Sequence, residues 1–190
     1  MFILVTGASA SGKSEYAECR ITAIHQEQRH LLYLATMQPY GEEGRARVAK
    51  HRKQRVLRNF ETLEWYKDLE QATIPMDSDV LLECMSNLAA NEMFAENTIP
   101  EQLEEYTHKC EDRILKGVEH IRKCSANLVI VTNEVFSDTL SYDETTLAYI
   151  RLLGHINAEL AQMADEVVEV VYGIPLSVKN PYMTEEEGAI

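Results

Sequence analysis

Four residues near the start of the chain have the types and the spacing of a phosphate-binding loop. Gly7, Gly12, Lys13 and Ser14 fit the pattern Gly-x-x-x-x-Gly-Lys-Ser/Thr, after an apolar run and before a helical pattern. The glycines allow backbone angles that other residues resist, so backbone N–H groups and the positive end of the helix dipole can face an anion. Lys13 can reach the outer phosphates, and the Ser14 hydroxyl can bind Mg²⁺. The pattern predicts a nucleoside triphosphate site; the alternative is a glycine-rich turn without a ligand.

Residues 45–58 concentrate positive charge in an acidic chain. This window, RARVAKHRKQRVLR, holds seven of the 18 Lys and Arg residues and no acid, although the formal net charge is −13. In a helix, Arg47, His51 and Arg55 share one face because they lie four residues apart. The arginine charges favour the neutral imidazole of His51, which is a nucleophile that can attack phosphorus. The alternatives are a solvated basic face with an incidental histidine and an RNA patch, for which interleaved aromatic residues are missing.

Polar side chains follow three of the expected strands. Glu83 ends one apolar run, and an acid at this place in a phosphate-loop protein typically lies near Mg²⁺. Asn133 and Glu134 follow a second run, and Thr36 follows a third. Ligands of open α/β sheets bind at the carboxyl ends of strands, so we expect all four residues to face the nucleotide. The alternatives are acids at a helix N-terminus or on the surface, and a capping hydroxyl at Thr36.

The elements that carry these residues alternate along the chain. Continuous apolar runs predict buried strands, and apolar spacings of three and four residues predict helices. The expected strands are residues 2–6, 31–35, 80–83, 128–132 and 167–172, and the expected helices are residues 14–28, 43–58, 100–124 and 145–163. This alternation predicts an α/β fold with a mainly parallel sheet. We expect one domain over residues 1–180 and an acidic tail over residues 181–190.

The composition of the chain limits the classes of binding partner and the cellular compartment that we expect. The net charge of −13 argues against non-specific binding to nucleic acid, and no apolar run is long enough to span a bilayer. A signal peptide is not predicted. The cysteines Cys19, Cys84, Cys110 and Cys124 form no Cys-x-x-Cys pair, which argues against zinc and for a reduced, cytoplasmic setting.

Several stretches together resemble one enzyme family. In order along residues 2–179 they are ILVTGASASGKSEYAE, YLAT, RVAKHRKQR followed by TLEW, LLEC, VTNEV and GHINAELAQMADEVVEVVYGIPLSVK. The phosphate loop alone is generic, whereas the Arg-x-x-x-His-x-x-x-Arg stretch and the last two blocks are far more specific together. The chain is similar to the bifunctional adenosylcobinamide kinase and adenosylcobinamide-phosphate guanylyltransferase family of cobalamin biosynthesis.

The resemblance implies a RecA-like P-loop NTPase fold and two reactions. The family phosphorylates the aminopropanol hydroxyl of a corrinoid, adenosylcobinamide, with ATP or GTP, and then transfers GMP from GTP to that phosphate with release of pyrophosphate. The transfer passes through a covalent histidine–GMP intermediate, and the matching position is His51, with Lys13 as the other catalytic residue. Ser14 and Glu83 are the implied Mg²⁺ ligands, and the family forms a trimer. The implied nucleotide contacts are Gly7, Ala8, Ser9, Ala10, Ser11, Gly12, Lys13, Ser14, Thr36, Met37, Gln38, Arg52, Lys53, Gln54, Arg55, Glu64 and Glu83.

The chain departs from the family's usual pattern at three places. Ala10 stands where the family has an arginine, Phe136 where it has a glycine, and Phe60 where it has a tryptophan. These positions lie around loops expected to shape the corrinoid or phosphate pocket. Two alternatives stay open: an enzyme with only one of the two activities, and a nucleotide-binding regulatory protein. A nucleophile at His51 favours an enzyme, because a regulatory switch needs none.

Overall fold

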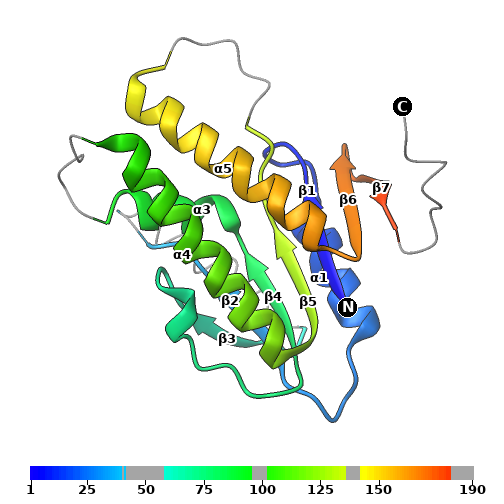
Figure 1. The fold of residues 1–190 in the computed structure, drawn as a ribbon. Helices are drawn as coiled ribbons and strands as arrows, with labels where there is room; N and C mark the ends of the chain where they lie inside the picture. The colour runs from blue at the N-terminus through cyan, green and yellow to red at the C-terminus, as the bar shows by residue number, and fades with distance from the viewer. Residues whose placement is uncertain (40, 42–57, 96–101, 136–141, 181–190) are drawn as a thin grey trace.

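The strands of the chain form one seven-stranded sheet (Figure 1). The computed structural model describes residues 1–39, 41, 58–95, 102–135 and 142–180. The spatial order of the strands is β3-β2-β4-β5-β1-β6-β7; all neighbours pair in parallel except β6 and β7, which are antiparallel. The strands are β1 (Phe2–Thr6), β2 (Leu31–Ala35), β3 (Glu61–Glu64), β4 (Ser78–Glu83), β5 (Ser125–Val131), β6 (Glu166–Val171) and β7 (Ile174–Lys179).

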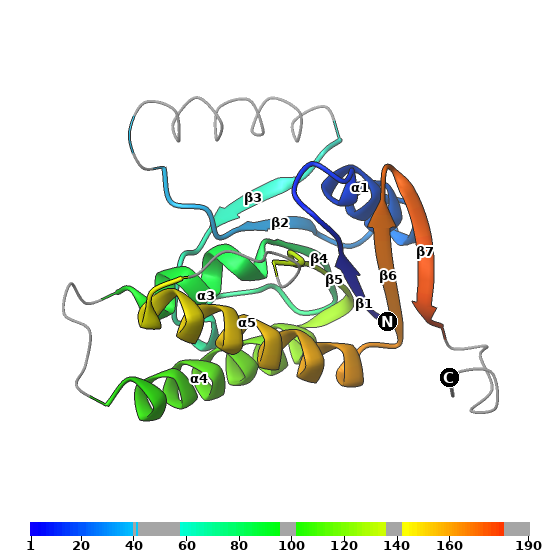
Figure 2. The ribbon, with the colours of Figure 1, turned by 90° about the horizontal axis from the view of Figure 1, so that it is seen from above.

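Helices cover both faces of this sheet. One face carries α1 (Lys13–Ile24), and the other carries α3 (Met85–Met93), α4 (Leu103–Cys124) and α5 (Glu144–Met163), as Figure 2 shows. Successive residues of β1 alternate between the two cores, because Phe2 and Leu4 pack on the α3–α5 side while Ile3 and Val5 pack on the α1 side. A strand buried on both faces is continuously apolar, which is why apolar runs predict these strands.

The five predicted strands are confirmed, with ends shifted by at most three residues. Helices α1, α4 and α5 match three of the four predicted helices. The fourth, residues 43–58, lies outside the described residues except for Arg58, and so does the acidic tail, residues 181–190.

Four elements are not predicted from the sequence. β3 is short and at most half-buried, β7 is exposed along most of its length and contains Pro175, and α3 has only nine residues. A single 3₁₀ turn, η1 (Leu69–Gln71), precedes β4. Edge strands and short helices carry weak hydrophobic patterns because they have little core to face.

Helix α1 ends at Ile24 instead of continuing to residue 28 because of a buried carboxylate on another strand. Asp79, which is fully buried in β4, lies 2.8 Å from Nδ1 of His25 and accepts the N–H of Gln26 at 3.3 Å. A buried charge is costly unless it is paired. The chain therefore leaves the helix where it can satisfy Asp79, a long-range effect that no local pattern reveals.

The strand order decides which residues meet at the carboxyl edge. β5 lies between β1, which leads into the glycine-rich loop, and β4, which ends at Glu83. The mainly parallel sheet with helices on both faces confirms the predicted α/β fold class. Ala35 of β2 pairs with Glu64 of β3 and with Glu83 of β4, which brings three strand ends side by side. In the part of the chain described, no helix has the length and apolar character needed to cross a membrane.

Candidate nucleotide-binding site

The loop between β1 and α1 has the backbone of a phosphate-binding loop. Gly7 and Gly12 have φ values of 151° and 94°, and Ala10 has a φ of 59°. A Cβ at Gly7 would lie 2.5 Å from the carbonyl oxygen of Val170, so only glycine fits there. The left-handed angle of Ala10 costs a non-glycine residue about 1–2 kcal/mol. Such strain is typical of loops shaped around a ligand.

Two neighbouring segments hold this loop. The N–H of Gly173, in the β6–β7 turn, donates to Ser11 O at 2.8 Å, and the N–H of Glu134, after β5, donates to Gly7 O at 3.1 Å. Residues 8–10 between these anchors are exposed. The hydroxyl of Ser11 is buried and has no hydrogen-bond partner within the described residues. Buried hydroxyls are almost always bonded, so this oxygen fits a loop whose missing partner is a phosphate.

Lys13 begins α1 and is only 8% exposed. Its Nζ reaches back across the loop and donates to Ala8 O at 3.0 Å. Burial lowers the pKa of Lys13 below its usual 10.5, and the nearby Cys84 and Glu83 oppose this shift. A buried ammonium has three donors, and phosphate oxygens are the strong acceptors that such a group favours.

Glu83 accepts a hydrogen bond on each of its carboxylate oxygens. Ser14 Oγ donates to Oε1 at 2.5 Å, and the buried hydroxyl of Tyr33 donates to Oε2. The Tyr33 ring packs edge-on against Phe60, with 5.6 Å between ring centroids. Sequence reasoning misses Tyr33, because an aromatic residue inside an apolar strand gives no functional signal. The two hydroxyls fix the carboxylate at the entrance of α1.

The Ser14–Glu83 pair fits a magnesium ion. Mg²⁺ prefers hard oxygen ligands and typically takes one or two from the protein and the rest from phosphates and water. The hydroxyl and carboxylate oxygens meet beside Lys13, at the start of α1. In the described residues, no cluster of three His, Cys, Asp or Glu side chains is arranged to hold a metal ion. A magnesium ion here would therefore depend on the phosphates of the nucleotide.

Thr36 lies at the carboxyl edge, as predicted, directly after β2. Glu64, an implied nucleotide contact, ends β3 at the same edge. The Thr36 hydroxyl is fully buried; it donates to Cys84 O and accepts from Cys84 N, both at 2.8 Å. It thus ties the end of β2 to the end of β4, which favours a structural role for this side chain. Met37 and Gln38 follow and are half-buried. Their contact with a nucleotide stays a prediction.

Asn133 also reaches the carboxyl edge. Its amide donates to Ser86 Oγ at 2.5 Å, and Ser86 Oγ lies 3.1 Å from the sulfur of Cys84. Burial raises the pKa of the Cys84 thiol. Cys84 therefore stays protonated at neutral pH, which makes its thiol a weak nucleophile.

The basic window is described only at its last residue. Arg58 Nη1 lies 3.1 Å from Glu18 Oε2, so the end of the window contacts α1, the helix that begins at Lys13. Five predicted site residues, together with Phe136, lie outside the described residues: His51, Arg52, Lys53, Gln54 and Arg55.

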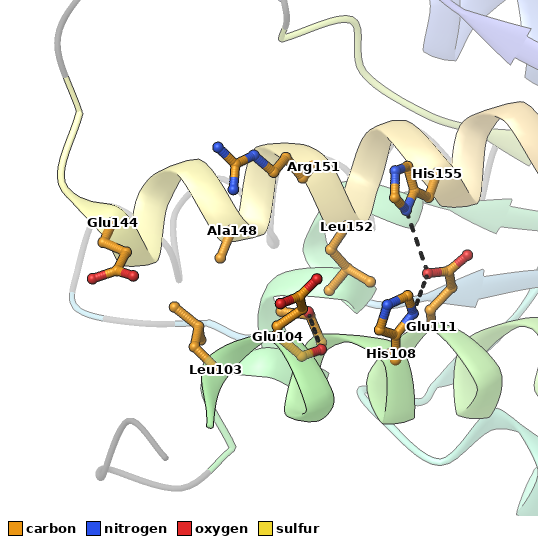
Figure 3. A pocket seen from close by; sticks show the side chains of 10 residues that line it. Leu103, Glu104, His108, Glu111, Glu144, Ala148, Arg151, Leu152 and His155 are labelled. Carbon is orange, nitrogen blue, oxygen red and sulfur yellow. Dashed lines mark hydrogen bonds and ion pairs between the residues drawn. The ribbon is translucent and has the colours of Figure 1, made fainter. Parts of the chain in front are cut away.

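A separate cavity of about 250 Å³ lies between α4 and α5 (Figure 3). Nδ1 of His108 and Nδ1 of His155 lie 3.8 Å and 3.6 Å from Glu111 Oε2, with both histidines largely exposed. Exposed ion pairs of this kind contribute little to stability. α4 and α5 cover the face of the sheet opposite α1, so this cavity is not the phosphate site.

The strained glycine loop, the buried lysine and the Ser14–Glu83 pair define the protein as a P-loop nucleotide-binding protein of the α/β class. The chain matches the CobU family model, cobinamide kinase / cobinamide phosphate guanyltransferase, over residues 3–178. The chain therefore belongs to this family. It is a transferase of cobalamin biosynthesis that acts as a cobinamide kinase and cobinamide phosphate guanyltransferase.

Individual relatives agree with this assignment. The chain is 34% identical over 187 residues to the bifunctional adenosylcobalamin biosynthesis protein CobU of Salmonella typhimurium (strain LT2), a match that covers 94% of this chain and 100% of the relative. It is 32% identical over 186 residues to the protein of the same name from Escherichia coli (strain K12), with the same coverage. Among solved structures, the flagellar accessory protein FlaH from Methanocaldococcus jannaschii is 10% identical with a TM-score of 0.47, covering 94% of this chain and 78% of that one.

Proposed function

We propose that this enzyme phosphorylates adenosylcobinamide with ATP or GTP and then transfers GMP from GTP to the new phosphate through a covalent bond to His51. The observation that carries the proposal is the convergence of Lys13 Nζ, Ser14 Oγ and Glu83 at the N-terminus of α1. One triphosphate site there serves both reactions, with a fresh nucleotide bound for each step, and the two steps differ in which phosphorus atom is attacked.

In the kinase step, the corrinoid hydroxyl attacks the γ-phosphorus and the nucleoside diphosphate leaves. Lys13 gives up its bond to Ala8 O and donates to the β- and γ-phosphate oxygens, while loop N–H groups hold the others. Ser14 and Glu83 would hold Mg²⁺, which would neutralise charge on the phosphates. Tyr33 keeps the Glu83 carboxylate oriented from its other oxygen.

In the transfer step, the neutral imidazole of His51 attacks the α-phosphorus of GTP, and pyrophosphate leaves from the loop. The corrinoid phosphate then attacks the phosphorus of His51–GMP, which frees the imidazole. Arg58 supports this assignment, because it anchors the end of the basic window to Glu18 of α1. His51 lies seven positions before Arg58, a span of at most about 25 Å when extended, which leaves His51 within range of the start of α1.

We further propose that the enzyme is a cytoplasmic homotrimer associated through β7. Ile174, Leu176 and Val178 alternate along this edge strand and are 62%, 47% and 56% exposed. A contiguous apolar strip on an open sheet edge is typical of an interface. The turn before β7 is bonded to the phosphate loop through Gly173 and Ser11, so a neighbouring subunit on β7 would border the nucleotide. The four cysteines are unpaired, which fits a reducing compartment.

Labelling with GTP tests the covalent step. GTP labelled at the α-phosphate should leave label on the protein, whereas γ-labelled GTP should leave none. A phosphoramidate, the P–N bond expected at His51, survives alkali and breaks in mild acid, while a phosphoserine ester behaves in the opposite way. His51→Ala should take no label, lose guanylyl transfer and keep much of the kinase activity.

His108→Ala is the matched control, because His108 is an exposed histidine of α4 that lies away from the loop. It should label like the wild type. Labelling of His51→Ala at the wild-type level would refute the covalent role of His51.

A further inference from the structure

Tyr33 of β2 reaches the carboxylate of Glu83 on β4, and the register of the two strands explains this contact. Tyr33 pairs with Leu81 and Ala35 pairs with Glu83, so Glu83 lies diagonally opposite Tyr33 on the same face of the sheet. Diagonal neighbours are within reach of aromatic and long side chains. Ala35, directly opposite Glu83, has a small side chain, which leaves room for the Tyr33 ring to extend to the carboxylate.

The Tyr33 ring is enclosed by the core on the α1 side of the sheet. It is 0% exposed and packs edge-on against Phe60, with 5.6 Å between ring centroids. Protein interiors are packed as closely as organic crystals, so an enclosed ring has little room to change rotamer. The Tyr33 hydroxyl therefore donates from a fixed point, and Oε2 of Glu83 is held at that point.

The two oxygens of the Glu83 carboxylate face different partners. Oε1 accepts from Ser14 Oγ at 2.5 Å at the start of α1, whereas Oε2 accepts from Tyr33 inside the core. Oε1 is therefore the oxygen on the side of the proposed Mg²⁺ ion. To bring both oxygens to one ion, the carboxylate would have to turn and give up the bond from Tyr33. This turn is unfavourable, because a hydrogen bond to a carboxylate is stronger than one between neutral groups.

Magnesium and calcium ions use a carboxylate in different ways. Ca²⁺ takes about six to eight oxygen ligands at about 2.3–2.6 Å and accepts both oxygens of one carboxylate, whereas Mg²⁺ demands a near-ideal octahedron at about 2.0–2.1 Å. The two oxygens of one carboxylate subtend too small an angle at an ion to fill two corners of an octahedron. A carboxylate with one oxygen available therefore suits Mg²⁺ and withholds a ligand from Ca²⁺.

We propose that Tyr33 is a positioning residue that makes the nucleotide site select Mg²⁺ over Ca²⁺. It does so by holding Oε2 of Glu83, which leaves one oxygen for the ion. Selection matters for the chemistry, because the longer bonds of Ca²⁺ would shift the phosphates away from the position that Lys13 and the loop favour. This inference rests on the proposed function, in which Ser14 and Glu83 would hold the ion.

The test removes a single oxygen atom. Tyr33→Phe deletes the hydroxyl and keeps the ring against Phe60; Tyr149→Phe is the control, because Tyr149 also donates a partly buried hydroxyl, to Ser86 O at 3.0 Å. The probe is α,β-methylene-GTP, which cannot give up its guanylyl group. Calorimetry measures the Kd of this analogue in saturating Mg²⁺ and in saturating Ca²⁺.

The readout is the ratio of the Kd with Ca²⁺ to the Kd with Mg²⁺, because any metal-independent effect on nucleotide binding cancels in it. We expect this ratio to fall about tenfold in Tyr33→Phe and to keep the wild-type value in Tyr149→Phe. Thermal unfolding accompanies the titrations, and both variants should lower Tm because both lose a hydrogen bond.

A lower Tm with an unchanged ratio in Tyr33→Phe would show that its hydroxyl has only a structural role, and the proposal would be overturned. Weaker binding by the same factor in both metals would overturn it as well. If the wild type bound the analogue equally well in Mg²⁺ and in EDTA, the magnesium site of the proposed function would be contradicted, and this inference with it.

Discussion

Replacement of Lys13 by alanine tests whether one phosphate loop serves both reactions. In the free enzyme the Lys13 ammonium makes one hydrogen bond, 3.0 Å from Nζ to Ala8 O. With nucleotide bound it exchanges this bond for two phosphate oxygens, a net gain of one charged hydrogen bond. A charged hydrogen bond contributes about 1.5–3 kcal/mol, so Lys13→Ala should weaken nucleotide binding by about 10- to 150-fold.

A second loss should appear in kcat. Charge develops on the leaving oxygen in both reactions, and removal of one such donor typically costs about 10²–10³-fold. Together the two effects predict a fall in kcat/KM of about 10³-fold or more for kinase and transferase alike. The assay measures both products from adenosylcobinamide and GTP. Lys179→Ala is the control, because Lys179 also donates to backbone carbonyls, at the end of α5.

The lowered pKa of Lys13 gives a second prediction, on how the free energy of unfolding depends on pH. Burial lowers its pKa in the folded enzyme below 10.5, so the unfolded chain holds this proton more tightly. The free energy of unfolding of the nucleotide-free enzyme should therefore rise as the pH rises through the lowered pKa toward 10.5. Lys13→Ala should flatten this rise and also abolish much of the nucleotide-induced increase in Tm. Either activity surviving near the wild-type level would show that a second nucleotide site exists and refute the one-site reasoning.

Two further changes probe the loop and the proposed interface. Gly7→Ala would place a Cβ 2.5 Å from Val170 O at a φ of 151°, so we expect at least tenfold weaker nucleotide binding by calorimetry. Gly41→Ala is the control: its φ of 63° is also strained for alanine, but its Cβ meets open space, so it should bind nucleotide normally. If the enzyme is the proposed trimer, Leu176→Asp should convert it to the 21.7 kDa monomer in light scattering, whereas Met76→Asp, at a more exposed position outside β7, should not. Equal masses for Leu176→Asp and the wild type would exclude this face of β7 as the interface.

The central strands can be predicted from the sequence because a strand that is buried on both faces has a continuous run of apolar residues. The edges cannot be predicted in the same way. β3 mixes acids with Thr62 and Leu63, and β7 presents an apolar strip to solvent, so neither fits a core pattern. The end of α1 depends on Asp79, which lies more than fifty residues away. Local patterns carry no information on such a contact.

The residues of the candidate site also fall into two groups, those that can be predicted from the sequence and those that cannot. The phosphate loop and Glu83 are found from the sequence, because their spacing is dictated by the shape of a phosphate and the place where a strand ends. Tyr33 is missed, because it acts on a partner, Glu83, that only the fold brings near. The family resemblance also implies a nucleotide contact at Thr36, whose hydroxyl the structure shows bonded to Cys84.

The position of the β-phosphate explains how a single loop can support two chemistries. In the kinase step the leaving group is the nucleoside diphosphate, and in the transfer step it is pyrophosphate, so the β-phosphate belongs to the leaving group both times. In the proposed mechanism, Lys13 and the N-terminus of α1 stabilise charge on this shared group. Residues around the loop should therefore affect both activities together, whereas His51 is proposed to take part only in the attack on the α-phosphorus. A variant that separates the two activities should then lie in the basic window of residues 45–58, and one that abolishes both should lie on the β1, α1 and β4 side.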